Sequence, residues 1–393
     1  MRNDALDGSD DLSYRQDFEP TILQVLDQKR LKRADPAYRP RTDGDTKAIL
    51  QAFFATVELG EEYQITNLRR MSGGASKEQF VFDQAAGTDR PPDRYVLRMD
   101  PLESIAETSR QREWEVLRAV EGTIPVPHAK WVDADGSMLG QPGLITSFVN
   151  GVPKPSDAPS NVTGLGTNLG PRFRGKLAEP FVDYLIKIHR FDWAHAELPS
   201  FGVPSADPYQ PARWQVNWWS RQWRDDVIES DPMMAAVEHW MRANLPACET
   251  LALVHGDYRT GNYLIDENAE RITAILDWEL AHIGDPIEDL GWVTMRPLGH
   301  ESEDGRFLVC GLFTREEFLA LYERKTGTTV DRKKLHFYEV LALYKCVVFA
   351  AACGMRSAIQ EHNHQNVLLT WVAHVAHAYR AELCELLARG PTE

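Results

Sequence analysis

Alternating apolar and polar residues mark the first 150 positions of the chain as rich in short β-strands. The two-residue period of a half-buried strand recurs five times, at 63–71, 78–84, 94–99, 129–133 and 143–149. The tripeptide Ser72-Gly73-Gly74 predicts a tight turn between the first two strands. Apolar residues at helical spacing predict helices in the same region at 19–33, 46–58 and 103–120. Asp45 is the expected N-cap of the second helix.

The remaining chain is mainly helical in pattern. Six segments carry apolar residues at helical spacing, at 176–191, 211–228, 232–244, 314–325, 331–355 and 363–388. A short run of strands at 251–278 interrupts them, and a loop rich in Pro, Gly, Ser and Asn precedes them. We therefore predict an α+β fold with an N-terminal arm (1–44), a small β-rich N-lobe (45–150) and a larger helical C-lobe (151–393). A ligand is expected in the cleft between the lobes.

The composition is that of an ordinary globular chain, with 43% hydrophobic and 26% charged residues among 393. A formal net charge of −15 repels polyphosphate backbones, so nucleic acid is not an expected partner. The acidic N-terminus lacks the pattern of a signal peptide. The most apolar stretch, 339–355, is interrupted by Lys345, and we expect no membrane span. Five cysteines without Cys-x-x-Cys spacing indicate reduced, mostly buried thiols in a cytoplasmic protein.

One motif carries most of the chemical information. The run His255-Gly256-Asp257-Tyr258-Arg259-Thr260-Gly261-Asn262 lies between two predicted strands, and Asp277 ends the next strand. A hairpin of this kind brings Asp257, Asn262 and Asp277 to one rim of a small sheet. Phosphoryl transfer needs a carboxylate that orients the attacking hydroxyl, together with an amide and a second carboxylate that hold Mg²⁺ on nucleotide phosphates. We interpret the motif as catalytic rather than as solvated turn residues.

A second group of residues is expected to hold the phosphates. Gly73 and Gly74 let the backbone approach a phosphate and turn its N–H groups inward, although a Gly-Gly pair is more often only a turn. Arg98 is a lone charge in an apolar strand, and Glu113 falls on the apolar face of the next predicted helix, whereas Glu115 points the other way. Because a buried carboxylate needs a partner, we predict an Arg98–Glu113 ion pair that places the arginine on the phosphates. The alternative leaves Glu113 at a partly exposed helix margin.

Several other conspicuous residues are assigned structural roles. We expect His255 to pack beneath its strand, hydrogen-bond the backbone and support Asp257, and His189 to pack at a helix end. Asp285 and Asp289 are expected to brace the segment after Asp277. Four C-terminal histidines lack the spacing of a metal site; they are His362, His364, His374 and His377.

The helix at 211–228 carries tryptophans on two different faces. The pairs Trp214/Trp218 and Trp219/Trp223 are each four residues apart and therefore each lie on one face. One face is expected in the core. The other either packs on the N-terminal arm or forms a wall of the acceptor pocket.

Five segments together resemble the aminoglycoside-phosphotransferase-like kinase superfamily, which includes choline kinases; they are SGGASKEQFVFD, YVLRMDP, REWEVLRAV, LVHGDYRTGN and ILDWELAHIGDPIEDLGW. Within it, the chain is most similar to the phosphotransferase domains associated with acyl-CoA dehydrogenases. The resemblance covers about 45–390. It implies a bilobal protein-kinase-like fold with ATP and Mg²⁺ bound between the lobes.

The resemblance also implies roles for single residues. Asp257 matches the catalytic aspartate, and Asn262 and Asp277 match the metal ligands. The residues that match nucleotide-binding positions are Gly73, Gly74, Ser76, Arg98, Glu113, Ser147 and Val149. Arg98 stands where most of the superfamily has lysine; arginine keeps the charge but differs in reach and geometry, which leaves the choice between ATP and GTP open.

The predicted function is an ATP- and Mg²⁺-dependent phosphotransferase that phosphorylates a hydroxyl group of a small molecule. The acyl-CoA-dehydrogenase-linked subgroup implies a hydroxyacyl-CoA or a related catabolic intermediate as the acceptor. An aminoglycoside or other antibiotic is the alternative, and the net charge of −15 suits a polycation. A nucleotide-binding pseudokinase that acts as a sensor or scaffold is a further alternative, against which stand the intact Asp257, Asn262 and Asp277.

Overall fold

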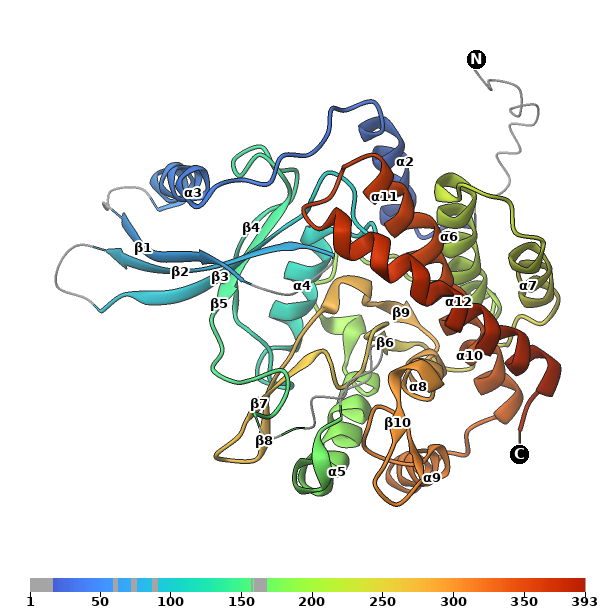
Figure 1. The fold of residues 1–393 in the computed structure, drawn as a ribbon. Coiled ribbons are helices and arrows are strands. Elements are labelled where there is room, and N and C mark those ends of the chain that lie inside the picture. The colour runs from blue at the N-terminus through green and yellow to red at the C-terminus, as the bar shows by residue number, and fades with distance from the viewer. Residues whose placement is uncertain are drawn as a thin grey trace, which may run out of the picture.

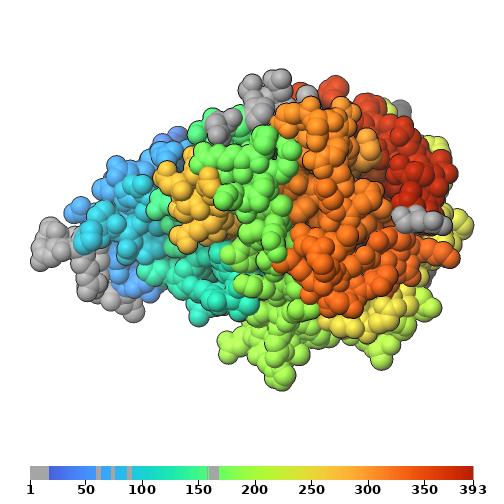
Figure 2. Space-filling model, turned by 90° about the horizontal axis from the view of Figure 1, so that it is seen from below, coloured from blue at the N-terminus to red at the C-terminus, as the bar shows by residue number. Residues whose placement is uncertain are grey.

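The fold is taken from a computed structural model, which describes residues 17–58, 63–71, 76–86, 91–156, 158 and 168–392. A lobe built around one antiparallel sheet adjoins a larger helical lobe (Figure 1). Seen from below, the strand-rich lobe narrows away from the broad helical lobe (Figure 2). The predicted α+β, two-lobed architecture is confirmed.

Five antiparallel strands form the N-lobe sheet in the order β1-β2-β3-β5-β4. They are β1 (Tyr63–Arg70), β2 (Glu78–Ala86), β3 (Asp93–Met99), β4 (Ala129–Asp133) and β5 (Gly143–Ser147). Helix α3 (Asp43–Val57) packs Phe53 and Phe54 into a cluster with Leu97 and Met99 of β3. Because side chains alternate across a strand, Arg98 lies on the opposite face of the sheet.

Helix α4 (Arg110–Val120) covers that opposite face, and it begins later than predicted. Residues 103–109 are not helical, because Ser109 caps α4 and the backbone carbonyl of Glu103 accepts hydrogen bonds from Ser357 Oγ and Asn363 Nδ2 in the C-lobe. Glu113 is fully buried, as predicted. Glu115 points the other way but is also buried, since its carboxylate accepts from the backbone N–H and the hydroxyl of Ser200.

The C-lobe is a set of helices with three small two-stranded sheets. Its helices are α5 (Gly170–His189), α6 (Gln210–Asp226), α7 (Pro232–Ala243), α8 (Ile287–Val293), α9 (Arg315–Thr326), α10 (Arg332–Val347), α11 (Met355–Ile359) and α12 (Asn366–Arg389). Helix α10 runs through the centre and contacts α6, α7, α8 and α12. A π-helical stretch, η4 (Val348–Gly354), joins α10 to α11 without a break.

The continuous helix 332–359 corrects the prediction about membrane spans. It has 28 residues, and by length and composition alone it could cross a membrane. Its most apolar window is 89% buried inside the protein, as expected for the central helix of a packed lobe. The sequence interpretation treated Lys345 as an interruption of the apolar stretch 339–355, but this side chain is buried and ion-paired with Glu288.

The N-terminal arm docks on the C-lobe through helix α2 (Pro20–Lys32), which lies beside α6. Phe18 and Ile22 of the arm pack against Trp214 and Trp218 around a cavity of only about 10 Å³. Trp219 is fully buried and stacks on Trp218. Of the two predicted alternatives for the outer tryptophan face, packing on the arm is therefore the one observed.

The start of α3 corrects a second prediction. Thr42, not Asp45, is the N-cap. The Thr42 hydroxyl accepts from the Asp45 N–H at 3.1 Å, and the Asp45 carboxylate accepts from the Thr42 N–H at 3.2 Å. This reciprocal pair is a capping box, in which the acidic residue occupies the third helical position.

Candidate active site

Two small two-stranded sheets hold the loop 255–262 in place. Strand β6 (Ala252–Val254) leads into it and pairs with β9 (His282–Gly284), and β7 (Tyr263–Asp266) leaves it and pairs with β8 (Arg271–Ile275). Gly256 has φ +82°, and a Cβ there would lie 2.7 Å from the carbonyl oxygen of Leu280. Glycine is therefore required at this turn.

Asp289 of α8 fixes the backbone of the same loop. Its carboxylate accepts from the N–H groups of His255 and Gly256 at 2.9 and 2.8 Å and from His189 Nε2 at 3.1 Å. The predicted bracing role of Asp289 thus falls on the loop before Asp257 rather than on the segment after Asp277. Asp285 does serve that segment, since it accepts from the Ile287 N–H at the start of α8.

Asp257 is held by donors on both carboxylate oxygens. Oδ1 accepts from Trp292 Nε1 at 2.8 Å and from Arg259 Nε at 3.0 Å, and Oδ2 accepts from Asn262 Nδ2 at 2.6 Å. Burial raises the pKa of Asp257, and the nearby charge of Asp277 adds to this, while Arg259 opposes it. The result is a fixed carboxylate with increased proton affinity, as required of a group that receives a proton from a substrate hydroxyl.

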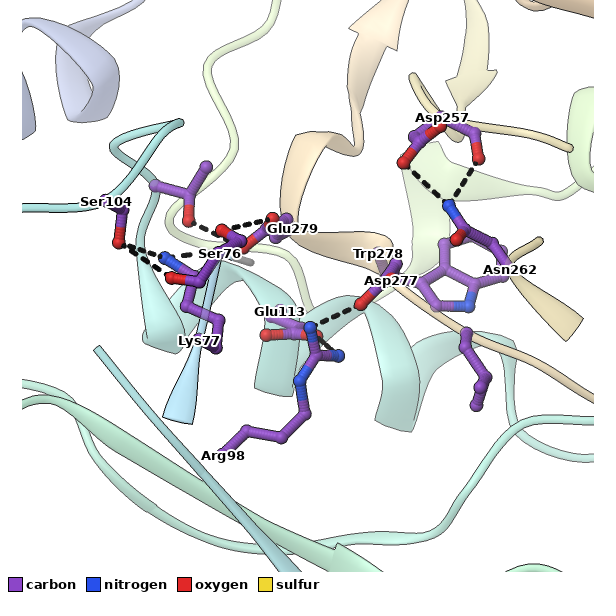
Figure 3. Close-up of polar contacts among 12 residues, drawn as sticks. Ser76, Lys77, Arg98, Ser104, Glu113, Asp257, Asn262, Asp277, Trp278 and Glu279 are labelled. Atoms are coloured by element: carbon purple, nitrogen blue, oxygen red, sulfur yellow. Dashed lines mark hydrogen bonds and ion pairs between the residues drawn. The ribbon is translucent and has the colours of Figure 1, made fainter. Parts of the chain in front are cut away.

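Asn262 lies next to Asp257, and the carboxylate of Asp277 faces Arg98 (Figure 3). Asn262 Nδ2 donates to both the backbone and the carboxylate of Asp257. Among the described residues no donor bonds to Asn262 Oδ1, so this oxygen can coordinate a cation. Asp277 has φ +61° and a side chain that is 36% exposed. One carboxylate and one amide oxygen next to phosphates are a donor set that fits Mg²⁺. Within the described residues no cluster of three or more His, Cys, Asp or Glu forms another metal site.

Arg98 joins the two lobes at this point. Its Nη1 lies 2.6 Å from Glu113 Oε1, and its Nη2 contacts Asp277 Oδ1. Burial of Arg98 works against its charge, but Glu113 and Asp277 outweigh this and raise the pKa of the guanidinium. The predicted Arg98–Glu113 ion pair is therefore present, and Asp277 is a second partner that was not predicted.

Sequence reasoning missed three charged residues that surround this pair: Lys77, Arg110 and Glu279. Glu279 Oε1 accepts from Ser76 Oγ at 3.1 Å (Figure 3). Its Oε2 lies 2.9 Å from Arg110 Nη2 and 3.4 Å from Lys77 Nζ. Burial would raise the pKa of Glu279, but the three cations Lys77, Arg110 and Arg98 lower it to about 2.

The sequence did contain a hint of these three residues, because each lies within a few positions of a predicted site residue. Lys77 lies three residues after Gly74 and immediately before β2, and Glu279 lies two residues after Asp277. Arg110 opens helix α4, three residues before Glu113, whose other carboxylate oxygen it contacts. Together they tie the N-lobe loop and α4 to the segment that carries Asp277.

The remaining predicted nucleotide contacts are placed as follows. Gly73 and Gly74 lie outside the described residues. Ser76 is engaged by Glu279 through its hydroxyl. Ser147 ends β5 and its N–H donates to the His128 carbonyl. Among the described residues, nothing accepts a hydrogen bond from the N–H of Val149, which leaves this group available at the junction of the lobes.

The histidine predictions hold where the structure tests them. His255 is fully buried, its Nε2 pairs with the Leu276 carbonyl at 3.1 Å, and its Nδ1 accepts from the Asp257 N–H. Burial lowers the pKa of His255, which favours the neutral ring that this acceptor role requires. His189 packs on Tyr322.

Comparisons with known proteins agree with this geometry. The model of the phosphotransferase enzyme family (APH) matches residues 67–337. Acyl-CoA dehydrogenase family member 10 of Mus musculus is 26% identical over 279 residues, which are 67% of this chain and 25% of that protein. Acyl-CoA dehydrogenase family member 11 of Homo sapiens is 25% identical over 290 residues, which are 70% of this chain and 35% of that protein. The chain thus spans about a quarter to a third of the length of these relatives.

Solved structures show the same fold. A putative aminoglycoside phosphotransferase from Ralstonia eutropha is 20% identical with a TM-score of 0.62, covering 88% of this chain and 99% of that one. An aminoglycoside phosphotransferase in ternary complex with AMP-PNP and hygromycin B is 16% identical with a TM-score of 0.54, covering 85% and 98%. With a family model that matches well over half of its length and a two-lobed fold of this kind, the chain belongs to the phosphotransferase enzyme family.

Proposed function

We propose that the protein is an ATP- and Mg²⁺-dependent kinase that phosphorylates a hydroxyl group of a small molecule. The observation that carries the proposal is that Asp257 is bonded to Asn262 and lies within the electrostatic influence of Asp277, which pairs with Arg98 of the Arg98–Glu113 ion pair. A solved relative that binds AMP-PNP supports a nucleotide between the lobes. The choice of ATP as the nucleotide and the identity of the phosphate acceptor are both part of the proposal.

In the proposed reaction each residue of the site has one task. Asp257 orients the acceptor hydroxyl and takes its proton as the new O–P bond forms and the bond to the nucleotide's leaving phosphate breaks. Trp292, Arg259 and Asn262 keep its carboxylate in one orientation. Asn262 and Asp277 would hold Mg²⁺, which would supply positive charge that offsets the charge on the phosphates. Arg98, fixed by Glu113, adds a cation on the N-lobe side.

For the acceptor we propose a hydroxyacyl-CoA or a related hydroxylated catabolic intermediate. Support comes from the relatives, which are named acyl-CoA dehydrogenase family members. The competing acceptor class is an aminoglycoside, and its support is the solved relative that binds hygromycin B. These two classes differ in charge, since the first is anionic and the second is polycationic.

The test is transfer of labelled phosphate from Mg²⁺-ATP to a panel of hydroxyacyl-CoA thioesters, hydroxy acids, choline, aminoglycosides and macrolides. Asp257→Asn is measured beside the parent chain, together with nucleotide binding by both. We expect a phosphorylated product that the parent makes and Asp257→Asn does not, with nucleotide affinity retained in the variant. Undiminished turnover by Asp257→Asn would refute the mechanism, and a parent chain that binds no nucleotide would refute the proposed function.

A further inference from the structure

The N-terminal arm lies before the residues that the family model matches, which begin at position 67. Nevertheless one of its residues contacts the helix that carries Glu113. Glu19 is the N-cap of α2 and is 7% exposed. Its Oε2 accepts from the Ile22 N–H at 3.1 Å and contacts Arg112 Nη1 at 2.5 Å, and its Oε1 accepts from the Gly202 N–H at 2.7 Å.

Arg112 connects three parts of the molecule. It stands next to Glu113 on α4 and is 4% exposed. Its Nη1 contacts Glu19 of the arm, and its Nη2 donates to the backbone carbonyl of Ala281 at 2.9 Å, four residues after Asp277. The guanidinium also lies over the ring of Phe201 at 4.5 Å. A single buried cation thus links the arm, helix α4 and the segment that follows the proposed metal ligand.

The far end of the arm helix is anchored separately. Lys29 is 2% exposed, and its Nζ lies 2.5 Å from Oδ2 of Asp226, which is fully buried at the end of α6. Burial works against the Lys29 charge, but Asp226 outweighs it and raises the pKa of the ammonium. This anchor touches neither α4 nor the segment after Asp277. Among the contacts of the arm, the Glu19–Arg112 pair therefore bears on α4, whereas the Lys29–Asp226 pair holds the arm to the C-lobe.

We propose that Arg112 is a positioning residue for the nucleotide site and that the arm, through Glu19, fixes its orientation. With Glu19 in place, Arg112 holds α4 against the Ala281 backbone, so Glu113 stays within reach of Arg98 and Arg98 within reach of Asp277. Loss of Glu19 leaves Arg112 free to turn and lets α4 move relative to the Asp277 segment. This inference rests on the proposed function, because the geometry that it protects is that of the nucleotide site.

The experiment compares variants at the two ends of the arm. Glu19→Gln and Arg112→Gln remove the link to α4, whereas Lys29→Met weakens the arm at its other anchor. Gly202→Ala perturbs Glu19 without altering any charge, since a Cβ at 202 would lie 2.6 Å from Glu19 Cγ. Asp17→Asn removes an exposed arm contact with Arg213 and serves as the neutral control. Each variant is titrated with Mg²⁺-AMP-PNP at a temperature where circular dichroism shows it folded, and amide hydrogen exchange is followed across 110–120.

We expect Glu19→Gln, Gly202→Ala and Arg112→Gln to bind the nucleotide about tenfold more weakly, within the range by which residues without ligand contact modulate a distant site. Exchange across 110–120 should quicken in the same three variants, and Arg112→Lys should restore part of the affinity. Lys29→Met should lower the melting temperature without this loss. Equal affinity in the parent and Glu19→Gln, or an equal loss in Lys29→Met, would overturn the inference while leaving the proposed function intact. A parent chain that binds no Mg²⁺-AMP-PNP would overturn both.

Discussion

Replacement of Glu279 by glutamine is predicted to lower the free energy of unfolding, and the contacts of Glu279 in the structure allow the size of this loss to be worked out. The carboxylate is only 11% exposed and interacts with Lys77, Arg110 and Ser76. Its pKa falls from the usual 4.5 to about 2 in the folded protein. At about 1.4 kcal/mol for each tenfold change in proton affinity, this corresponds to roughly 3 kcal/mol of stability at neutral pH. Buried ion pairs that lose one partner typically cost about the same.

The sign of the pH dependence follows from the lowered pKa. The stabilisation by Glu279 is fully present above pH 4.5, its unfolded value, and is lost as the pH falls toward about 2. Glu288, which is also buried and whose pKa is likewise lowered to about 2 by Lys345 and His282 against the effect of burial, adds a second contribution over the same window. The unfolding free energy of the parent should therefore decline steeply between pH 5 and pH 2.

Urea unfolding at several pH values between 3 and 7 measures both effects. Glu279→Gln should lower the unfolding free energy at pH 7 by roughly 3 kcal/mol and flatten its decline below pH 5. Glu303→Gln is the control, because Glu303 pairs with Arg174 while 54% exposed, and such exposed pairs contribute at most about 1 kcal/mol. If Glu279→Gln keeps the parent's midpoint and the parent's pH profile, the assignment of Glu279 as a buried stabilising charge is wrong.

Three further changes have expected outcomes. Asp277→Ala should abolish the Mg²⁺ dependence of nucleotide binding, measured by titration with and without Mg²⁺; unchanged dependence would exclude Asp277 as the metal ligand. Gly291→Ala should destabilise by about 1–3 kcal/mol, because the added Cβ would lie 2.7 Å from the backbone carbon of Tyr338, which cannot move aside easily; an unaltered melting temperature would contradict this packing. Thr42→Ala should cost about 1 kcal/mol through loss of the capping box, as measured by urea unfolding, whereas Asp43→Asn should change little.

Periodicity in the sequence was sufficient to predict the burial of residues whose position on a strand or helix decides which way they face. The apolar face of α4 identified Glu113 as buried, and Arg98 stood out as a lone charge in an apolar strand. The ion pair between Arg98 and Glu113 followed from the cost of a buried charge. His255 was correctly read as a backbone partner, because a loop between two apolar strands places it beneath them.

The misses share a different cause, which is contact between distant segments. Lys77, Arg110 and Glu279 lie close in sequence to residues of the predicted site, but only the meeting of three segments makes them a cluster. Apolar residues at helical spacing suggested a helix from residue 103. The structure holds that segment by hydrogen bonds to Ser357 and Asn363, more than 250 positions away. Such ties follow from tertiary packing and cannot be inferred from periodicity.

The π-helical stretch 348–354 sets the rotational phase of everything that follows it on the long helix. A π-helical turn holds one more residue than an α-helical turn, so the later side chains lie about 100° behind the positions they would have on an uninterrupted α-helix. In that shifted phase Ser357 reaches Glu103 of the other lobe. A deletion of one residue within 348–354 would restore a plain α-helix and leave Ser357 facing Glu103, whereas a deletion in α10 would turn it away. A relative with one residue fewer within this stretch should therefore keep the same contact between its two lobes.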